Sequence, residues 1–245
     1  NEGGVSVSWT APTDNGGNAI SDYVVQSCIS TTCTTFADGV STVTSASVTG
    51  LTKGTAYTFQ IAAKNDAGTG AYSTATTPAV TPRTVPGAPT NVVGTLGNGQ
   101  VSLTWSAPTD NGGNTISDYT VQYCISDSCS TFVRTASAST NAIVTGLTNG
   151  TAYTFQVAAV NAAGQGSYSV RSSAVTPRTV PDAPTGVSAV VDNTGGVDVS
   201  WTAPTNTGGN AISDYTLQSC ISSTCSTFTR SASTSTSVKV TGLVK

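Results

Sequence analysis

Residues 101–123 read VSLTWSAPTDNGGNTISDYTVQY, and this stretch decides the fold. Apolar and polar residues alternate over 101–105 and again over 119–123, which is the period of a β-strand with one buried face. The residues between these runs include a proline, an aspartate and two adjacent glycines, which favour turns. The stretch therefore predicts two strands joined by a loop. A third alternating run covers 153–159, and because no segment has the apolar spacing of a helix, we expect almost no helix.

The same pattern occurs three times along the 245 residues. Trp9, Trp105 and Trp201 follow one another at intervals of 96 residues, and two series of cysteines keep the same spacing. This period exceeds the roughly 20–50 residues of solenoid repeats and suits one small domain per repeat. Proline-rich joints favour extended, semi-rigid linkers. We therefore predict an end-to-end rod of three domains, namely repeat one (1–84), repeat two (85–179) and repeat three (180–245).

Three runs carry a resemblance to a known family. Residues 105–119 resemble the B strand, BC loop and C strand of fibronectin type III domains, and residues 144–164 resemble the E strand, tyrosine corner and F strand. Residues 180–184, VPDAP, are similar to the proline-rich entry into strand A. The resemblance implies an all-β fold of tandem immunoglobulin-like β-sandwiches, with corner tyrosines whose hydroxyls bond nearby backbone. The expected core residues are Trp9, Trp105, Trp201, Leu51, Leu147 and the corner tyrosines Tyr57 and Tyr153.

Against this family pattern the first and third repeats are incomplete. Repeat one has no counterpart of strand A, which matches 85–96 of repeat two. Repeat three has no counterparts of strands F and G, which match 152–177 of repeat two. We therefore expect the chain to be a stretch of a longer array. Its low charge and its many serines and threonines favour a bacterial origin.

Each repeat carries a Cys-x4-Cys pair after its predicted C strand: Cys28 with Cys33, Cys124 with Cys129, and Cys220 with Cys225. A four-residue hairpin loop would place the two cysteines opposite each other, close to disulfide geometry. We predict a local disulfide in each repeat, which implies an extracellular, oxidising location. One pair supplies only two of the four ligands that zinc needs, and no helix is predicted beside it for redox chemistry. Bridging between molecules stays as an alternative.

Two further motifs have both a structural and a functional interpretation. The loop at 12–18, PTDNGGN, gathers oxygen side chains near glycines as calcium loops do, but Asn206 stands in repeat three where Asp14 and Asp110 stand in the others. We predict turns in which these aspartates bond their own backbone, with calcium as the alternative. The second motif, which begins at Asn149 and reads NGT, is a formal glycosylation acceptor.

Composition excludes several classes of function. Nine basic residues against twelve acidic ones give a net charge of −3, which argues against a nucleic-acid partner. No apolar run is long enough for a membrane-spanning helix, so no membrane insertion is expected. The chain has no histidine, and its single glutamate is Glu2. We therefore predict that it is not an enzyme and that it has no catalytic residues, no metal and no cofactor.

These observations favour a non-catalytic extracellular array that acts as a spacer or adhesive stalk within a longer surface protein. Its partners would be other copies or neighbouring subunits, or a cell-surface or polysaccharide ligand. One alternative is a subunit or decoration of an extracellular filament or phage virion fibre, because exposed sheet edges can pair laterally. The other is a carbohydrate-binding accessory module of a secreted enzyme. That role needs an exposed aromatic strip, whereas most aromatic residues here fall on inward positions, with Tyr123 as the exception.

Overall fold

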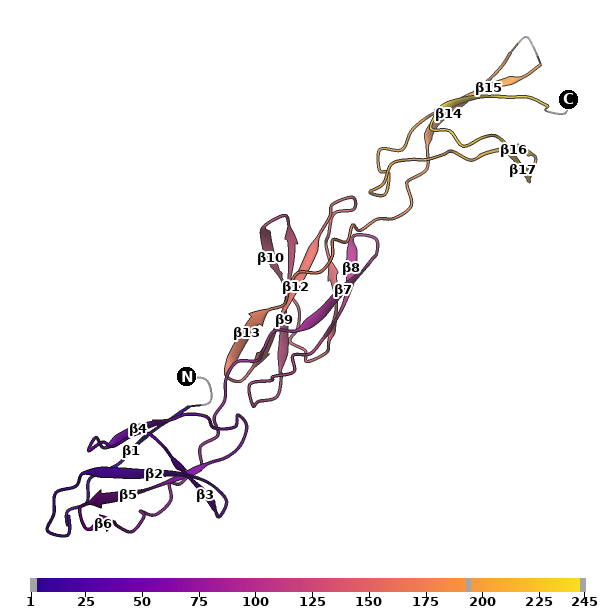
Figure 1. Ribbon diagram of the computed structural model, residues 1–245. Helices are drawn as coiled ribbons and strands as arrows, with labels where there is room; N and C mark the ends of the chain where they lie inside the picture. The colour runs from indigo at the N-terminus through magenta and orange to yellow at the C-terminus, as the bar shows by residue number, and fades with distance from the viewer. Residues whose placement is uncertain (1–3, 193–194, 243–245) are drawn as a thin grey trace.

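The computed structural model describes residues 4–192 and 195–242, which form strands and turns without a helix. Figure 1 shows three groups of strands that follow one another along a line. The groups contain β1–β6, β7–β13 and β14–β18. In the described part of the chain, no helix is long and apolar enough to cross a membrane. The fold is thus an all-β row of sandwiches.

Repeat two is a sandwich of two antiparallel sheets. The first sheet has the order β11-β8-β7 and the second the order β10-β9-β12-β13. The strands are β7 (Thr90–Leu96), β8 (Gln100–Ser106), β9 (Asp118–Ile125), β10 (Ser128–Phe132), β11 (Asn141–Thr145), β12 (Thr154–Asn161) and β13 (Gly164–Tyr168). The alternating runs of the sequence are therefore β8, β9 and β12, one in the first sheet and two in the second.

Repeat one has the same second sheet and a smaller first sheet. Its second sheet has the order β3-β2-β5-β6, whereas the first pairs β1 with β4 alone among the described residues. The strands are β1 (Val5–Ser8), β2 (Asp22–Ile29), β3 (Thr32–Phe36), β4 (Ser45–Val48), β5 (Thr58–Asn65) and β6 (Gly68–Thr69). No described strand of repeat one takes the place that β7 holds in repeat two.

Repeat three has a complete first sheet and a smaller second sheet. The order is β14-β15-β18 in the first sheet, and the second pairs β16 with β17 alone among the described residues. The strands are β14 (Thr185–Val191), β15 (Val197–Thr202), β16 (Leu217–Ile221), β17 (Thr224–Phe228) and β18 (Ser237–Val240). Trp201, Tyr215, Leu217 and Phe228 consequently line an open apolar pocket of about 460 Å³.

The core of repeat two follows directly from the period of its strands. Successive side chains of a strand point to opposite faces, so Val101, Leu103 and Trp105 of β8 all face the second sheet. Val121 and Phe155 meet them from β9 and β12, and both are fully buried. Burial of apolar area at roughly 25 cal/mol per Å² makes this layer the main stabilising contribution to the sandwich.

The expected core residues are buried to different degrees. Trp105, Trp201, Tyr57, Tyr153 and Leu147 are buried. Trp9 and Leu51 are only partly buried and pack against the core of repeat one. The smaller first sheet of repeat one explains the difference for Trp9, because a two-stranded sheet covers less of the indole.

The tyrosines at 57 and 153 bond nearby backbone in the way that the family resemblance implies. The N–H of Thr52 donates to the hydroxyl of Tyr57 at 3.1 Å, and the N–H of Thr148 donates to that of Tyr153 at the same distance. Each bond holds a turn, called here the corner turn, at residues 52–55 and 148–151. These two turns face the next repeat along the chain.

Candidate functional site: the joints between repeats

The cysteines of each repeat lie opposite each other at the end of a hairpin. The structure joins Cys28 to Cys33, Cys124 to Cys129 and Cys220 to Cys225. The expected four-residue loop is wrong, because the strands continue one pair beyond the cysteines: in repeat two Ile125 pairs with Ser128. A two-residue turn remains, and its first residue, Ser126, has a φ of 51°. That left-handed conformation closes hairpins whose strands twist in the normal sense.

Replacing Cys124 and Cys129 together with alanine is expected to make local opening of the β9–β10 hairpin easier by about 2 kcal/mol, since the closed loop is short and the stabilisation grows with loop length. The loss should be local to the β9–β10 hairpin. Amide hydrogen exchange of this hairpin, compared with β8 in the same sample, measures it. A uniform loss over both sheets would contradict a local role.

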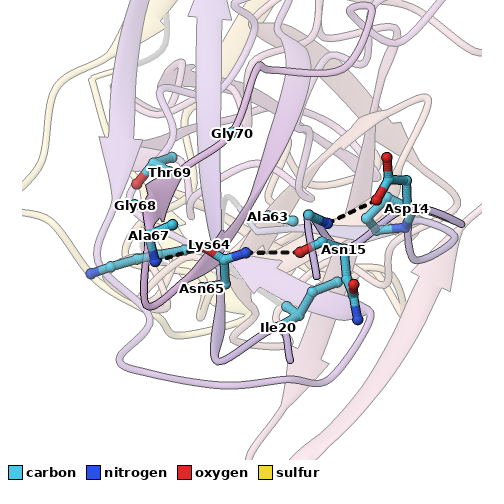
Figure 2. A pocket seen from close by; sticks show the side chains of 12 residues that line it. Asp14, Asn15, Ile20, Ala63, Lys64, Asn65, Ala67, Gly68, Thr69 and Gly70 are labelled. Carbon is cyan, nitrogen blue, oxygen red and sulfur yellow. Dashed lines mark hydrogen bonds between the residues drawn. The ribbon is translucent and has the colours of Figure 1, made fainter. Parts of the chain in front are cut away.

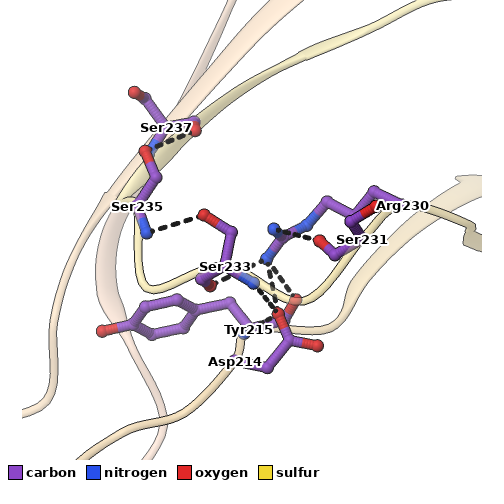
Figure 3. Close-up of polar contacts among 7 residues, drawn as sticks. All are labelled: Asp214, Tyr215, Arg230, Ser231, Ser233, Ser235 and Ser237. Atoms are coloured by element: carbon purple, nitrogen blue, oxygen red, sulfur yellow. Dashed lines mark hydrogen bonds and ion pairs between the residues drawn. The ribbon is translucent and has the colours of Figure 1, made fainter.

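In repeats two and three an arginine side chain bonds an aspartate near the start of the second sheet, an arrangement called here the arginine clamp. In repeat three Arg230 Nη2 donates to Asp214 Oδ1 at 3.0 Å and to Tyr215 O at 2.6 Å, and Ser233 N donates to the same carboxylate oxygen at 2.9 Å (Figure 3). The Ser233 hydrogen bond, more than the charge of Arg230, holds the pKa of Asp214 below its ordinary value, while partial burial opposes it. The clamp fixes the segment after β17 against the residues that precede β16.

Repeat two has the same clamp, whereas repeat one lacks its arginine. Arg134 Nη2 donates to Asp118 Oδ1 at 3.0 Å, and the arginine side chain is only 15% exposed. In repeat one Asp38 stands at the position of the arginine, while Asp22 keeps the backbone bond from Ser41 at 3.0 Å. Two carboxylates thus replace an oppositely charged pair.

Replacing Asp38 with arginine is therefore expected to stabilise repeat one by about 1 kcal/mol, because it exchanges like charges for a partly buried, charge-assisted hydrogen bond. Hydrogen exchange of the β2 amides reports the change. Asp66→Arg, with the same change of charge in an exposed turn of the same repeat, is the control. Equal gains in the two variants would assign the effect to net charge alone.

Each joint brings together the linker that enters a repeat, a loop of that repeat and the corner turn of the preceding repeat. The loop carries two adjacent glycines and is called here the Gly-Gly loop. The Gly-Gly loops are 12–18, 108–114 and 204–210, and the linkers are 84–87 and 179–182. The sequence predicts a turn in the loop and an extended linker at the joint, and the structure brings the two into contact.

At the first joint the linker lies along the Gly-Gly loop through main-chain hydrogen bonds. Thr84 N donates to Gly112 O at 2.9 Å, and Gly87 N donates to Asp110 O at 2.8 Å. The buried side chain of Asn161 donates through Nδ2 to Thr84 O at 2.8 Å. These bonds hold the linker extended and tie it to both the loop and the end of β12.

The two glycines of the loop allow backbone to approach backbone. A Cβ atom on Gly112 would overlap the carbonyl oxygen of Thr84, and one on Gly113 would overlap the amide nitrogen of Gly54 in the corner turn of repeat one. Their φ angles of 71° and 74° also lie in the left-handed region that favours glycine. Both conformation and space therefore require glycine here.

A salt bridge also crosses the first joint. Lys53 Nζ lies 2.9 Å from Asp110 Oδ2. The hydrogen bond from Lys53, followed by that from the Gly112 N–H, lowers the pKa of Asp110. Because the pKa is lowered in the folded state, this contact is complete at neutral pH and is lost only as the pH falls below the ordinary titration range of an aspartate.

The second joint repeats the backbone contacts of the first. Thr179 N donates to Gly208 O at 2.8 Å, and a Cβ atom on Gly209 would overlap the amide nitrogen of Gly150. Asparagines stand at the positions of the lysine and the aspartate of the first joint. The two joints therefore share their main-chain geometry and differ in charge.

Asn149, the formal glycosylation acceptor, uses its side chain beside this second joint. Its Nδ2 donates to Asn98 Oδ1 at 2.8 Å, and its Oδ1 accepts from Gly99 N at 2.8 Å. The amide nitrogen that would carry a glycan thus holds the corner turn against the loop before β8.

The acidic residues of the Gly-Gly loops bond their own backbone, as the turn interpretation predicts. Asp14 and Asp110 each accept a hydrogen bond at 2.8 Å from the glycine two residues further on. Asn206 does the same at 3.0 Å, because an amide oxygen supplies the same acceptor. Among the described residues, no group of three or more cysteine and acidic side chains is placed to hold a metal ion. Glu2 lies outside the described residues.

Tyr123 does not form the exposed aromatic that the sequence suggested. It packs, partly buried, against the core of repeat two, with its ring centre 6.1 Å from that of Tyr153. Among the described aromatic side chains, Tyr72 is the one that ranks as exposed, at 37%. The described surface therefore lacks the aromatic strip on which a sugar chain would stack.

A row of antiparallel sandwiches joined by short linkers defines a modular class of protein. The model of the fibronectin type III domain matches residues 1–79 and 87–175, and the chain belongs to the fibronectin type III family. It is 37% identical over 198 residues to chitinase A1 of Niallia circulans. These residues make up 78% of this chain and 26% of the relative. It is 32% identical over 226 residues to exoglucanase B of Cellulomonas fimi. These residues make up 86% of this chain and 19% of the relative.

A relative of another kind is the cell adhesion molecule Dscam1 of Drosophila melanogaster, which is 35% identical over 131 residues, 51% of this chain and 6% of the relative. The chain thus spans at most 26% of the length of these relatives. The similarity therefore concerns the fibronectin type III portion that polysaccharide-degrading enzymes and adhesion proteins share.

Proposed function

We propose that the chain is a non-catalytic extracellular spacer or stalk within a longer surface protein, folded as domains at 1–84, 85–179 and 180–245. The observation that carries the proposal is the joint, which recurs with the same main-chain contacts at both boundaries. A joint made of backbone hydrogen bonds and glycine-to-glycine contacts leaves little room for bending, so it keeps neighbouring repeats in line. The three disulfides suit an oxidising location outside the cell.

A second candidate is an accessory array of a secreted polysaccharide-degrading enzyme. The similarity to a chitinase and an exoglucanase favours this role. The shortage of exposed aromatic side chains on the described surface weighs against direct binding of sugar. In such an enzyme the array would therefore act as a spacer between other domains.

Small-angle X-ray scattering of the full chain tests the proposal. A stiff row of repeats should give a maximum dimension that does not change with protein concentration and a scattering profile typical of a rod. A compact or highly flexible ensemble would overturn it. Growth of the particle with concentration would favour the filament or virion-fibre alternative, and co-sedimentation with chitin or cellulose would favour a carbohydrate-binding module.

A further inference from the structure

Repeat one carries an open groove at the end that faces away from repeat two. The groove has a volume of about 290 Å³ and lies between the Gly-Gly loop and the β5–β6 hairpin (Figure 2). Asp14, Asn15 and Gly16 line one side, and Asn65 with Gly70 lines the other. Figure 2 shows the Asn65 side chain reaching across to the loop, where Nδ2 donates to Asn15 O at 2.8 Å.

The same groove of repeat two is filled by the linker. Asn161, the counterpart of Asn65, donates to Asn111 O and also to Thr84 O of the linker, both at 2.8 Å. A Cβ atom on Gly166, the counterpart of Gly70, would overlap the carbonyl oxygen of Pro86. The walls of this groove are therefore shaped around the backbone of an extended Thr-Val-Pro-Gly segment.

The Gly-Gly loop of repeat one already has the conformation of its counterpart in the filled groove. Gly16 has a φ of 67° where Gly112 has 71°. Asp14 and Asp110 hold these glycines with identical hydrogen bonds of 2.8 Å. The difference is exposure, since Gly16 is exposed whereas Gly112 is buried. A preformed site loses little conformational entropy on binding, which favours an extended ligand.

We propose that this groove binds an extended Thr-Val-Pro-Gly segment from another fibronectin type III repeat, whose corner turn then meets Gly17. The inference deepens the proposed array function and rests on it for the end-to-end order of repeats. The segment suits the site because proline fixes its extended backbone and because recognition runs through carbonyl groups. The Asn65 amide has two hydrogens, of which Asn15 O takes one, so it can also donate to the threonine carbonyl as Asn161 does.

A synthetic peptide with the sequence of residues 81–90, TPRTVPGAPT, tests the groove on the full chain. Titration should produce saturable NMR shifts of the Gly16, Gly17 and Asn65 amides, and a scrambled peptide should produce none. Gly16→Ala should weaken binding at least tenfold, because its Cβ would meet the threonine carbonyl. Gly39→Ala is the matched control, since Gly39 has a φ of 81° and nothing within 4 Å. It should bind as the unchanged chain does.

A second version of the experiment detects the interaction even if the separate peptide binds weakly. A copy of residues 81–96 fused before Asn1 raises the effective concentration of the segment to about the millimolar range. Strong hydrogen-exchange protection of Gly16 and Gly17 that Gly16→Ala abolishes and Gly39→Ala keeps would support the proposal. No response in either form, or protection that Gly16→Ala leaves intact, would overturn it. Shifts caused by calcium alone, without the peptide, would overturn it in favour of a cation site. A rod-like scattering profile without peptide binding would refute this inference and leave the spacer function standing.

Discussion

Replacing Gly112 with alanine is expected to open the first joint while leaving both adjoining repeats folded. The new Cβ would overlap the Thr84 carbonyl oxygen, so the linker has to move away from the loop. That movement breaks the Thr84 N to Gly112 O bond and the Asn161 bond to Thr84. At about 1 kcal/mol for each bond, the joint should lose roughly 2 kcal/mol, while the positive φ of the alanine adds about 1–2 kcal/mol of strain to the loop.

Two measurements read this loss at the joint itself. Hydrogen exchange of the Thr84 and Gly87 amides should accelerate about thirtyfold, which corresponds to roughly 2 kcal/mol, and scattering should show a more flexible chain. Gly146→Ala is the matched control, because Gly146 lies in the same repeat with a φ of 75° and nothing within 4 Å of its Cβ position. It should cost only the 1–2 kcal/mol of backbone strain and leave the linker amides unchanged. Equal exchange at the linker in both variants would show that the joint does not depend on the close approach at Gly112.

The sandwich could be predicted from sequence because its determinants are local. Alternation over 101–105 and 119–123 places Trp105 and Tyr119 on inward faces whatever the rest of the chain does. The period of 96 residues then extends this interpretation to the other repeats. Cysteines with four residues between them on a hairpin lie close together when the two strands pair.

The joints could not be predicted in the same way because they depend on contacts between distant residues. Gly113 meets Gly54, and Asn161 meets Thr84, across separations that no local period encodes. The available signal is the pair of adjacent glycines in each Gly-Gly loop, because glycine lets another backbone approach closely. The hairpin loop was predicted too long because Ser126 adopts a positive φ, which sequence preference does not favour for serine.

Replacing Trp105 with alanine is expected to destabilise repeat two by about 3–5 kcal/mol, the usual cost of removing a large aromatic side chain from a packed core. The indole is 6% exposed, and its ring centre lies 5.3 Å from that of Tyr119 in an edge-to-face contact. Both sheets would border the resulting cavity, so β8 and β9 should lose protection together. Hydrogen exchange of the Val121 amide, in the middle of β9, measures the loss without relying on tryptophan fluorescence.

Trp9→Ala provides the comparison that assigns this cost to coverage by the sheets. Trp9 makes the same edge-to-face contact, with Tyr23 at 5.3 Å, but it is only partly buried, and no described strand takes the place of β7 beside it. Because the hydrophobic gain scales with apolar area removed from water, Trp9→Ala should cost repeat one about half as much. Val133→Ala, at a side chain that is 90% exposed, should change stability by less than about 0.5 kcal/mol. Equal losses for Trp9 and Trp105 would mean that the aromatic pair, and not the third strand of the first sheet, sets the contribution of the tryptophan.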